Sequence, residues 1–428
     1  MADSDLFSSN LLNQVSMKPI TLLQHREAAD AIREAFETRV AWIAPSLDRG
    51  WRWQSFLKEF SAVCPKTVVF TGQWPGFTPG FEGAFNIHPL KGFRRVNFRE
   101  SEMGYPNGFM WVSPRSLLDL LRFHPDVILS NGFHLCTLYA LLVKAISGSR
   151  LILLWQGVSP ETGGGKGTFR LKLRRFLSRY FDLAICNTQS GVDYLERLVG
   201  MPREKVVRFI GEVADRSSFP SLNGRRKFEA PPKRPRFLFV GRIIRAKGVD
   251  RLLQACALLT QGGITDFSVV LVGKGPHHDE FVELAYKCGV ADYVHWEGFV
   301  PYERLGQYYE ACDVFVLPSL EDTWGVVALE AMAFGKPVLC SRFAGSSELV
   351  EHGVSGFVFD PDKPEELAMY MRSFIERPQL IARQGAAARA TMERFTPRRA
   401  AATLAQIIHQ TLKSEAVVGA CDFDAPDA

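Results

Sequence analysis

The chain has 428 residues, of which 46% are hydrophobic and 23% charged, and its formal net charge is +5. A charge this small argues against a nucleic-acid binder held by bulk electrostatics, and the length exceeds that of one hydrophobic core, so we expect two domains. The eight cysteines are scattered without C-x2-C spacing, which predicts reduced thiols and neither a zinc site nor a disulfide framework. The acidic start Met-Ala-Asp-Ser-Asp and the lack of a run of about 18 apolar residues predict a cytoplasmic protein.

Short apolar segments alternate with helical patterns along the first half of the chain. This alternation predicts a parallel sheet covered by helices on both faces. The expected strands are 39–44, 67–71, 125–129, 150–155 and 183–187, with helical patterns such as 134–146 between them. We expect residues 1–213 to form an N-terminal Rossmann-like domain; the family resemblance described below implies that this domain binds the acceptor.

The segment 166–181 combines six cations with an apolar stripe at helical spacing. The cations are Lys166, Arg170, Lys172, Arg174, Arg175 and Arg179, and the stripe is Phe169, Leu173, Phe176, Leu177 and Tyr180. One interpretation is a helix packed on the first domain with a solvated basic side. The other is an interfacial helix that meets anionic lipid or a pyrophosphate-linked acceptor. The preceding run 162–167 departs twice from a phosphate-loop pattern, so we expect a mobile loop over the cleft.

Residues 214–235 are polar, basic and proline-rich, which predicts a linker between two domains. Beyond them the alternation resumes, and we expect a second Rossmann-like domain over 236–396. Its predicted strands are 237–240, 268–272, 294–296, 314–317 and 337–340. A last helix is expected at 397–413, and a disordered tail at 414–428.

The second domain opens with a strand, a glycine turn and a helix, which together make a phosphate site. Arg236 to Val240 is the apolar strand, Gly241 allows the turn, and Lys247 precedes the helix. Arg242 and Lys247 are the cations on this turn. A diphosphate leaving group needs such donors, because negative charge builds up on it as the glycosidic bond breaks.

A second motif places one carboxylate in a loop and another eight residues later in an apolar helix. The loop residue is Asp322 and the helical residue is Glu330, and Gly325 opens the helix between them. Because the free N–H groups of a helix N-terminus attract anions, this arrangement suggests a sugar nucleotide with its phosphates at the helix end. The alternative is that both acids merely stabilise the turn and the helix.

Both motifs resemble those of retaining glycosyltransferases of the glycosyltransferase family 4 type, also called group 1. The run 321–333 resembles the family's E-x7-E motif, with Asp322 in place of the first Glu, and 240–248 resembles its VGR-x4-KG segment. Further family-like segments extend the resemblance over 236–375, whereas in the first half only the strand pattern matches. The resemblance implies the GT-B fold, in which two Rossmann-like domains with parallel sheets face a cleft, and a last helix that crosses back onto the first domain.

The resemblance also implies the roles of individual residues. Asp322 would contact the donor sugar, Glu330 the ribose hydroxyls, and Arg242 and Lys247 the diphosphate. The other expected donor-site residues are Gly241, Gly273, Val300, Thr323, Trp324, Gly325 and Val326. In the first domain, Gly50 is a candidate acceptor contact, and Gln156 stands near where the family often has a histidine.

We therefore expect a retaining transferase that moves a sugar from a nucleotide-diphosphate sugar to a glycan or lipid-linked glycan, in polysaccharide or glycoconjugate synthesis. The resemblance implies a front-face mechanism without a side-chain nucleophile. No cofactor and no catalytic metal are expected, because Asp360-Pro361-Asp362 follows a strand where Asp is an ordinary helix cap. Two alternatives stay open: a GT-B nucleotide-sugar epimerase, and a catalytically degenerate scaffold.

Overall fold

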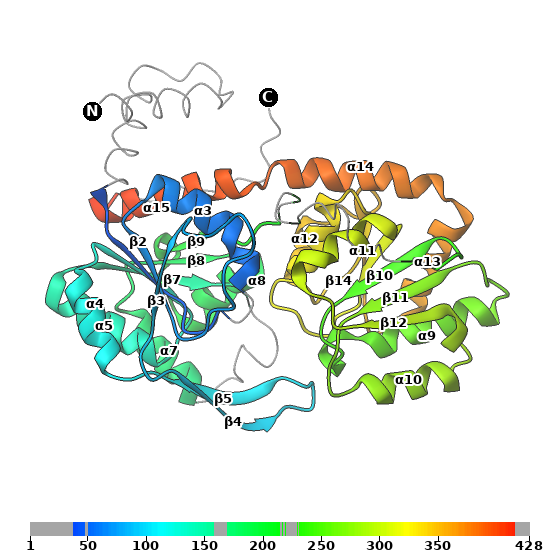
Figure 1. The fold of residues 1–428 in the computed structure, drawn as a ribbon, viewed down its shortest axis with the longest axis horizontal. Helices are drawn as coiled ribbons and strands as arrows, with labels where there is room; N and C mark the ends of the chain where they lie inside the picture. The colour runs from blue at the N-terminus through cyan, green and yellow to red at the C-terminus, as the bar shows by residue number, and fades with distance from the viewer. Residues whose placement is uncertain are drawn as a thin grey trace, which may run out of the picture.

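The computed structural model describes residues 37–47, 50–157, 169–214, 216, 219, 229 and 231–415, and only the backbone of residues 99, 100, 106 and 107. These residues form two α/β domains that lie side by side, each built around a sheet of parallel strands (Figure 1). The predicted fold of two parallel-sheet domains is therefore confirmed. The expected mobile loop at 162–167, much of the expected linker and the tail from residue 416 lie outside the described residues.

The sheet of the first domain has seven strands in the order β3-β2-β1-β6-β7-β8-β9, all parallel. Its strands are β1 (Val40–Ile43), β2 (Thr67–Thr71), β3 (Asn86–Pro89), β6 (Val127–Asn131), β7 (Arg150–Trp155), β8 (Leu183–Cys186) and β9 (Val206–Arg208). Its helices are α3 (Gln54–Val63), α4 (Arg115–Phe123), α5 (Leu135–Ser147), α7 (Phe169–Ser178) and α8 (Gln189–Asp193). The five strands and the helix predicted from the sequence are all present.

The sheet of the second domain has six parallel strands in the order β12-β11-β10-β13-β14-β15. They are β10 (Arg236–Val240), β11 (Ser268–Val272), β12 (Val294–Gly298), β13 (Val314–Leu317), β14 (Val338–Ser341) and β15 (Gly356–Phe359). The helices are α9 (Val249–Gln261), α10 (His278–Lys287), α11 (Leu305–Ala311), α12 (Val326–Ala333), α13 (Pro364–Glu376), α14 (Gln379–Glu393) and α15 (Pro397–Lys413). The five strands predicted here are present as well.

Side chains alternate between the two faces of each central strand, and both faces are buried. In β1, Val40 and Trp42 pack on one side with α3 and α15, whereas Ala41 and Ile43 pack on the other side with α5. In β10, Leu238 and Phe239 are divided between two core clusters in the same way. Burial on both faces explains why these strands read as continuous apolar runs in the sequence.

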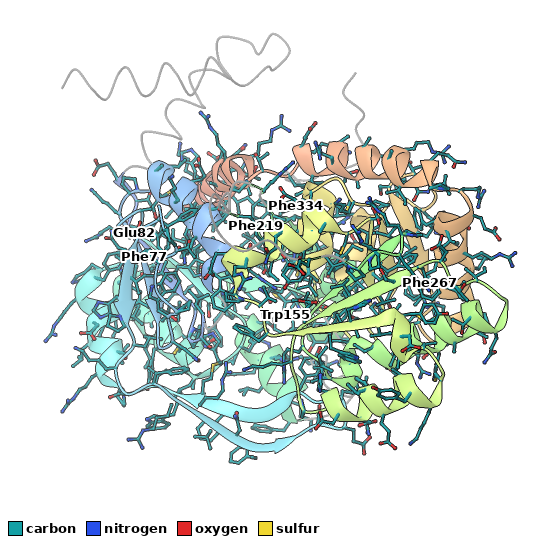
Figure 2. The ribbon with its side chains drawn as sticks, turned by 45° about the vertical axis from the view of Figure 1, so that its right-hand side comes forward. Phe77, Glu82, Trp155, Phe219, Phe267 and Phe334 are labelled. Atoms are coloured by element: carbon teal, nitrogen blue, oxygen red, sulfur yellow. The ribbon has the colours of Figure 1, made fainter. Side chains whose placement is uncertain are left out.

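The two domains are also joined outside their sheets. Helix α14 packs on α12 of the second domain, and α15, which follows it, packs on α3 of the first domain (Figure 1). Phe219, from the segment between the domains, packs its ring against Phe334 and Tyr309 (Figure 2). The exact domain boundaries stay predictions.

The sequence analysis missed the edge strands β3, β9 and β15 and an antiparallel hairpin. The hairpin consists of β4 (Arg94–Glu100) and β5 (Pro106–Trp111) and forms a two-stranded sheet of its own (Figure 1). Strand β4 is largely polar, the apolar part of β5 is only Phe109 to Trp111, and β9 has only three residues, so none of them produces a clear apolar run. Over the part of the chain that the structure describes, no helix combines the length and apolarity needed to span a bilayer.

Candidate functional site

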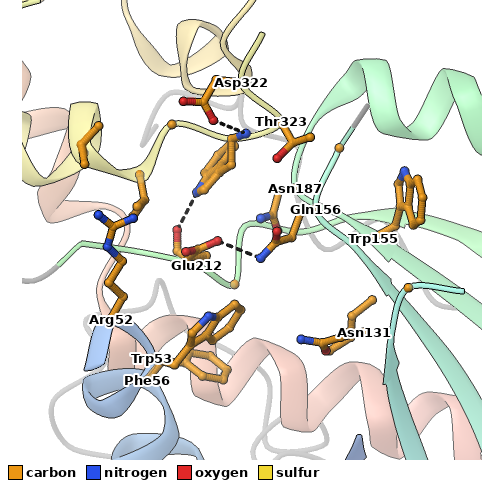
Figure 3. A pocket seen from close by; sticks show the side chains of 18 of the residues that line it. Arg52, Trp53, Phe56, Asn131, Trp155, Gln156, Asn187, Glu212, Asp322 and Thr323 are labelled. Atoms are coloured by element: carbon orange, nitrogen blue, oxygen red, sulfur yellow. Dashed lines mark hydrogen bonds between the residues drawn. The ribbon is translucent and has the colours of Figure 1, made fainter. Parts of the chain in front are cut away.

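A cavity of about 560 Å3 lies between the two domains, where the parallel strands of both sheets end (Figure 3). The carboxyl ends of parallel strands are the usual place for a ligand in open α/β sheets. One wall follows β10 and β13 of the second domain and includes residues 241, 242, 247 and 322–327. The other wall comes from the first domain and includes Trp42, Arg52, Asn131, Gln156, Asn187 and Glu212.

The turn after β10 brings the first cation of the predicted phosphate site to the cavity. Gly241 continues the strand pairing through its N–H to the carbonyl of Val272, and Arg242 follows it at the cavity wall. The Arg242 guanidinium donates through Nη2 to the carbonyl oxygen of Gly104, 3.1 Å away. One of the five guanidinium donors is thus used within the protein, and the group faces a cavity large enough for a ligand.

Lys247 and Asp322 form an ion pair in the cavity wall. Lys247 Nζ lies 2.6 Å from Asp322 Oδ2, and the side chains are only 15% and 14% exposed. Burial disfavours the charged ammonium group, but Asp322 and then Tyr105 outweigh it and raise the pKa of Lys247 above its ordinary value. Lys247 is therefore charged at neutral pH and can attract an anion that enters the cavity.

The N-terminus of α12 opens onto the same cavity. Gly325 precedes the helix with φ of +80°, a left-handed conformation that glycine adopts without strain, and no side chain caps the helix. Thr323, Trp324, Gly325 and Val326 all line the cavity. Because the first N–H groups of a helix have no partner within it, this end can bind a phosphate.

Trp324 also connects the loop before α12 to the first domain. Its indole N–H donates to the backbone carbonyl of Glu212 over 3.0 Å, and the side chain is almost fully buried (Figure 3). The Glu212 carboxylate in turn accepts a hydrogen bond from Gln156 Nε2, 3.1 Å away. Gln156, which stands near where the family often has a histidine, thus lies in the cavity wall beside Glu212. The sequence analysis did not identify Glu212.

Glu330 lies behind the cavity wall rather than in it. Its carboxylate is 1% exposed, accepts a hydrogen bond from Tyr309 over 2.6 Å, and lies 3.6 Å from Nε of Arg52 in the first domain. Burial raises the pKa of the Glu330 carboxyl. Arg52 and the hydroxyl groups of Tyr309 and Tyr302 lower this pKa but do not outweigh the effect of burial. A contact between Glu330 and ribose stays a prediction.

Three further predicted residues do not line the cavity. Gly273 underlies the phosphate turn, since a Cβ there would lie 1.7 Å from the carbonyl oxygen of Gly241. Gly50 is packed beneath Trp74, and Val300 is half-buried against the core shared by both domains. These residues shape the backbone and the packing around the site, and any contact with a ligand stays a prediction.

The tip of the β4–β5 hairpin reaches the phosphate turn of the second domain. Besides the Gly104 carbonyl on Arg242, the carbonyl of Met103 accepts from the Ala246 N–H over 3.2 Å, and Tyr105 Oη donates to the carbonyl of Glu321 over 3.1 Å. The sequence contained no indication that the hairpin tip contacts the turn after β10, because about 140 residues separate Gly104 from Arg242. Asn131 could have been found as a polar residue at the end of an apolar strand, whereas Glu212 lies beyond the short strand β9, which the sequence analysis missed.

Comparisons with known proteins match two family models to nearly the whole described chain. "Glycosyl transferase 4-like domain" matches residues 31–209, and "Glycosyl transferases group 1" matches residues 222–391. An uncharacterized glycosyltransferase of Methanocaldococcus jannaschii is 35% identical over 147 residues, which are 34% of this chain and 37% of that protein. A D-inositol 3-phosphate glycosyltransferase of Streptomyces griseus is 36% identical over 166 residues, which are 37% of this chain and 35% of that protein.

Solved structures match over a larger part of the chain. Anabaena HepE in complex with UDP has a TM-score of 0.67 at 20% identity, and the match covers 88% of this chain and 100% of HepE. Sucrose-phosphate synthase from Thermosynechococcus elongatus has a TM-score of 0.68 at 19% identity, with the same coverage of 88% and 100%. This likeness, together with the two parallel sheets, shows that the predicted GT-B fold is correct.

Proposed function

The chain belongs to the group 1 glycosyltransferases, and from that premise we propose that it transfers a sugar from a nucleotide-diphosphate sugar to a glycan or lipid-linked glycan, with retention of configuration and without a metal ion. The reaction would serve polysaccharide or glycoconjugate synthesis. Structural neighbours described in complex with UDP and with UDP-glucose make a UDP-sugar the first donor to test.

One observation carries the proposal: two cations and a helix N-terminus converge on a single cavity beside a carboxylate. Arg242, Lys247 and the start of α12 all line the same space, with Asp322 paired to Lys247. As the glycosidic bond breaks, negative charge develops on the diphosphate, and fixed donors in a partly buried site stabilise that charge without reorganising. In this proposal, Asp322 accepts a hydrogen bond from a hydroxyl of the donor sugar.

The same cations make a metal ion unnecessary in this proposal. A metal in a sugar transferase would neutralise the leaving diphosphate, and here Arg242 and the charged Lys247 supply that positive charge from the protein. Retention would follow a front-face path in which the acceptor approaches from the side of the departing diphosphate. No side chain is then the nucleophile, and the site contributes by positioning the donor.

The acceptor would bind to the wall from the first domain. Gln156, Glu212 and Asn131 offer hydrogen-bond donors and acceptors there, and Trp53 offers an apolar face (Figure 3). Such a mixture suits a sugar, which combines hydroxyl groups with apolar C–H faces. We propose that the protein acts in the cytoplasm and contacts the inner face of an anionic membrane peripherally.

Donor binding tests the proposal most directly. A donor present at 100 times its Kd stabilises the protein by about 2.7 kcal/mol, so a thermal-shift series with UDP-, GDP- and ADP-sugars should show one clear responder. The responder should then release free nucleotide diphosphate in the presence of acceptor. Conversion of the donor to an isomerised nucleotide sugar without any acceptor would instead indicate an epimerase, and no turnover with any donor would indicate a degenerate scaffold.

A further inference from the structure

Helix α7 turns its apolar stripe outward. Of the stripe residues, Leu177 is buried, but Phe169, Leu173, Phe176 and Tyr180 are exposed, and Phe169 is 78% exposed. The buried side of the helix is formed instead by Leu171, Leu177 and Ser178. Of the two interpretations of this segment, an exposed apolar face is therefore favoured, because four of the five stripe residues are not covered by the first domain.

Helix α5 adds a second exposed stripe beside the first. Leu138, Leu142 and Ile146 follow one another at four-residue spacing, and each is exposed, Ile146 to 68%. Between the two helices runs an apolar groove of about 530 Å3, lined by Leu138, Leu141, Leu142, Lys144, Ala145, Phe176, Leu177 and Tyr180. We call the exposed faces of α5 and α7 with this groove the α5–α7 surface.

This concentration of exposed apolar side chains is unusual for the molecule. Of the 17 large apolar side chains that are exposed among the described residues, seven belong to the α5–α7 surface. A contiguous exposed apolar patch commonly marks a site of interaction, whereas single exposed apolar residues need no explanation. The surface is therefore a candidate interaction site.

The charges around the apolar residues indicate the kind of partner. The sequences of α5 and α7 contain five cations and no Asp or Glu. Arg170, Lys172 and Arg179 are exposed and form no ion pair with any residue that the structure describes. A second copy of the chain would place these cations against their own equivalents, since a twofold interface brings the same patch together. A partner with a negatively charged surface and an apolar interior would accommodate both the cations and the exposed apolar side chains.

We infer that the α5–α7 surface docks the protein onto the face of an anionic lipid bilayer. The apolar side chains would enter the boundary between headgroups and acyl chains, and Arg170, Lys172 and Arg179 would contact the anionic headgroups. Arg174 is not part of this contact, because its guanidinium lies over the ring of Trp155 and donates to Tyr194. The inference rests on the membrane contact of the proposed function, for which it names the surface, and it does not involve the donor site.

Sedimentation of the full-length protein with vesicles tests the inference. Vesicles of phosphatidylcholine with phosphatidylglycerol should bind the protein at low salt, and vesicles of phosphatidylcholine alone should bind it much more weakly. Replacing Arg170, Lys172 and Arg179 together by Gln should lower the partition onto anionic vesicles on the order of 100-fold. Replacing Leu142 and Phe176 together by Ser should lower it roughly 10- to 30-fold.

Matched substitutions elsewhere separate the surface from general charge or stickiness. Lys287, Arg377 and Arg383 replaced together by Gln remove three exposed cations from the second domain, and Tyr286→Ser removes an exposed aromatic ring there. Both controls should bind vesicles within about twofold of the wild-type protein. Circular dichroism of every variant checks that the fold is intact.

Three results would overturn the inference. The first is that the wild-type protein does not bind anionic vesicles at low salt. The second is that the controls lose as much vesicle binding as the α5–α7 variants. The third is that light scattering shows an oligomer, which the Leu142 and Phe176 substitutions dissociate. The last result would assign the surface to a second copy of the chain. Because donor binding is measured separately by thermal shift, a failure here leaves the proposed transfer reaction standing.

Discussion

The two walls of the central cavity are built in different ways. The wall from the second domain is contributed by two short stretches, 241–247 and 322–327, in which the functional side chains follow a strand and precede a helix. The wall from the first domain collects single residues from the ends of several strands and from a turn after β1. The comparison teaches that the features expected of a phosphate site, a helix end with adjacent cations, can be recognised within a short stretch of sequence. A surface for an acceptor needs no such local pattern.

The walls also differ in how their charges are held. In the second domain Lys247 is paired within the wall, with Asp322. From the first domain Arg52 reaches across the interface to Glu330, a residue of the other domain's motif. The following substitutions test whether each of these contacts stabilises the fold or contributes to donor binding. They are given in order of decreasing expected effect.

The pair of Arg52 and Glu330 should give the largest effect, and on stability. Arg52→Met leaves the Glu330 carboxylate buried without its cation, and loss of one partner from a buried pair costs about 3–5 kcal/mol. The free energy of unfolding from denaturant titration measures the loss. The exposed pair of Arg245 and Glu280 provides the control, and Arg245→Met should cost less than about 1 kcal/mol.

A double substitution sharpens this result. Combining Arg52→Met with Glu330→Gln removes the uncompensated charge, so part of the lost stability should return. If the double variant is as unstable as the sum of the two single variants, the interaction is not electrostatic, and packing of the Arg52 side chain explains the loss.

The two cations of the phosphate turn should give the largest effect on rate. Loss of one fixed donor to developing charge lowers kcat about 10²- to 10³-fold, so Arg242→Ala and Lys247→Ala should each remove most turnover while the fold stays intact. Arg245 lies in the same turn, but its side chain pairs with Glu280 instead. Arg245→Ala therefore serves as the matched control. Normal turnover of a folded Lys247→Ala protein would contradict the diphosphate assignment.

Glu330→Gln tests the predicted ribose contact against a purely structural role. If the carboxylate binds the ribose diol in the donor complex, loss of a charge-assisted hydrogen bond of about 1.5–3 kcal/mol should weaken donor binding roughly 10- to 100-fold. In this variant, donors with 2′-deoxyribose should bind as tightly as donors with ribose. Unchanged discrimination with lowered stability would show that Glu330 only holds Arg52 and Tyr309.

The hairpin tip should give the smallest effect, on donor affinity. Gly104 has φ of +83°, and a Cβ there would lie 2.8 Å from Cβ of Ile244, so Gly104→Ala should push the tip away from Arg242. Loss of one hydrogen bond that orients the guanidinium should raise the donor KM about fivefold. Gly83 has φ of +72° with open space around it, so Gly83→Ala carries similar backbone strain without the collision and should leave KM unchanged.

The sequence by itself determined the order and type of the main elements and the cavity wall that the second domain contributes. Ten predicted strands appear in the structure because buried parallel strands are continuous apolar runs, a signal that needs no knowledge of neighbours. Gly241, Arg242, Lys247, Asp322 and Thr323 to Val326 meet at one cavity because strand-to-turn-to-helix connections are local.

Only the tertiary structure decided what crosses between distant segments. Arg52 on Glu330, Gly104 on Arg242 and Trp324 on Glu212 each join residues more than 100 positions apart, and no periodicity in the sequence records such a pairing. The outward face of α7 was undecided for the same reason: helical spacing shows that an apolar stripe exists, but the neighbouring elements determine whether it is covered. Which side chains remain for a donor, an acceptor or a membrane therefore depends on contacts that only the folded chain makes.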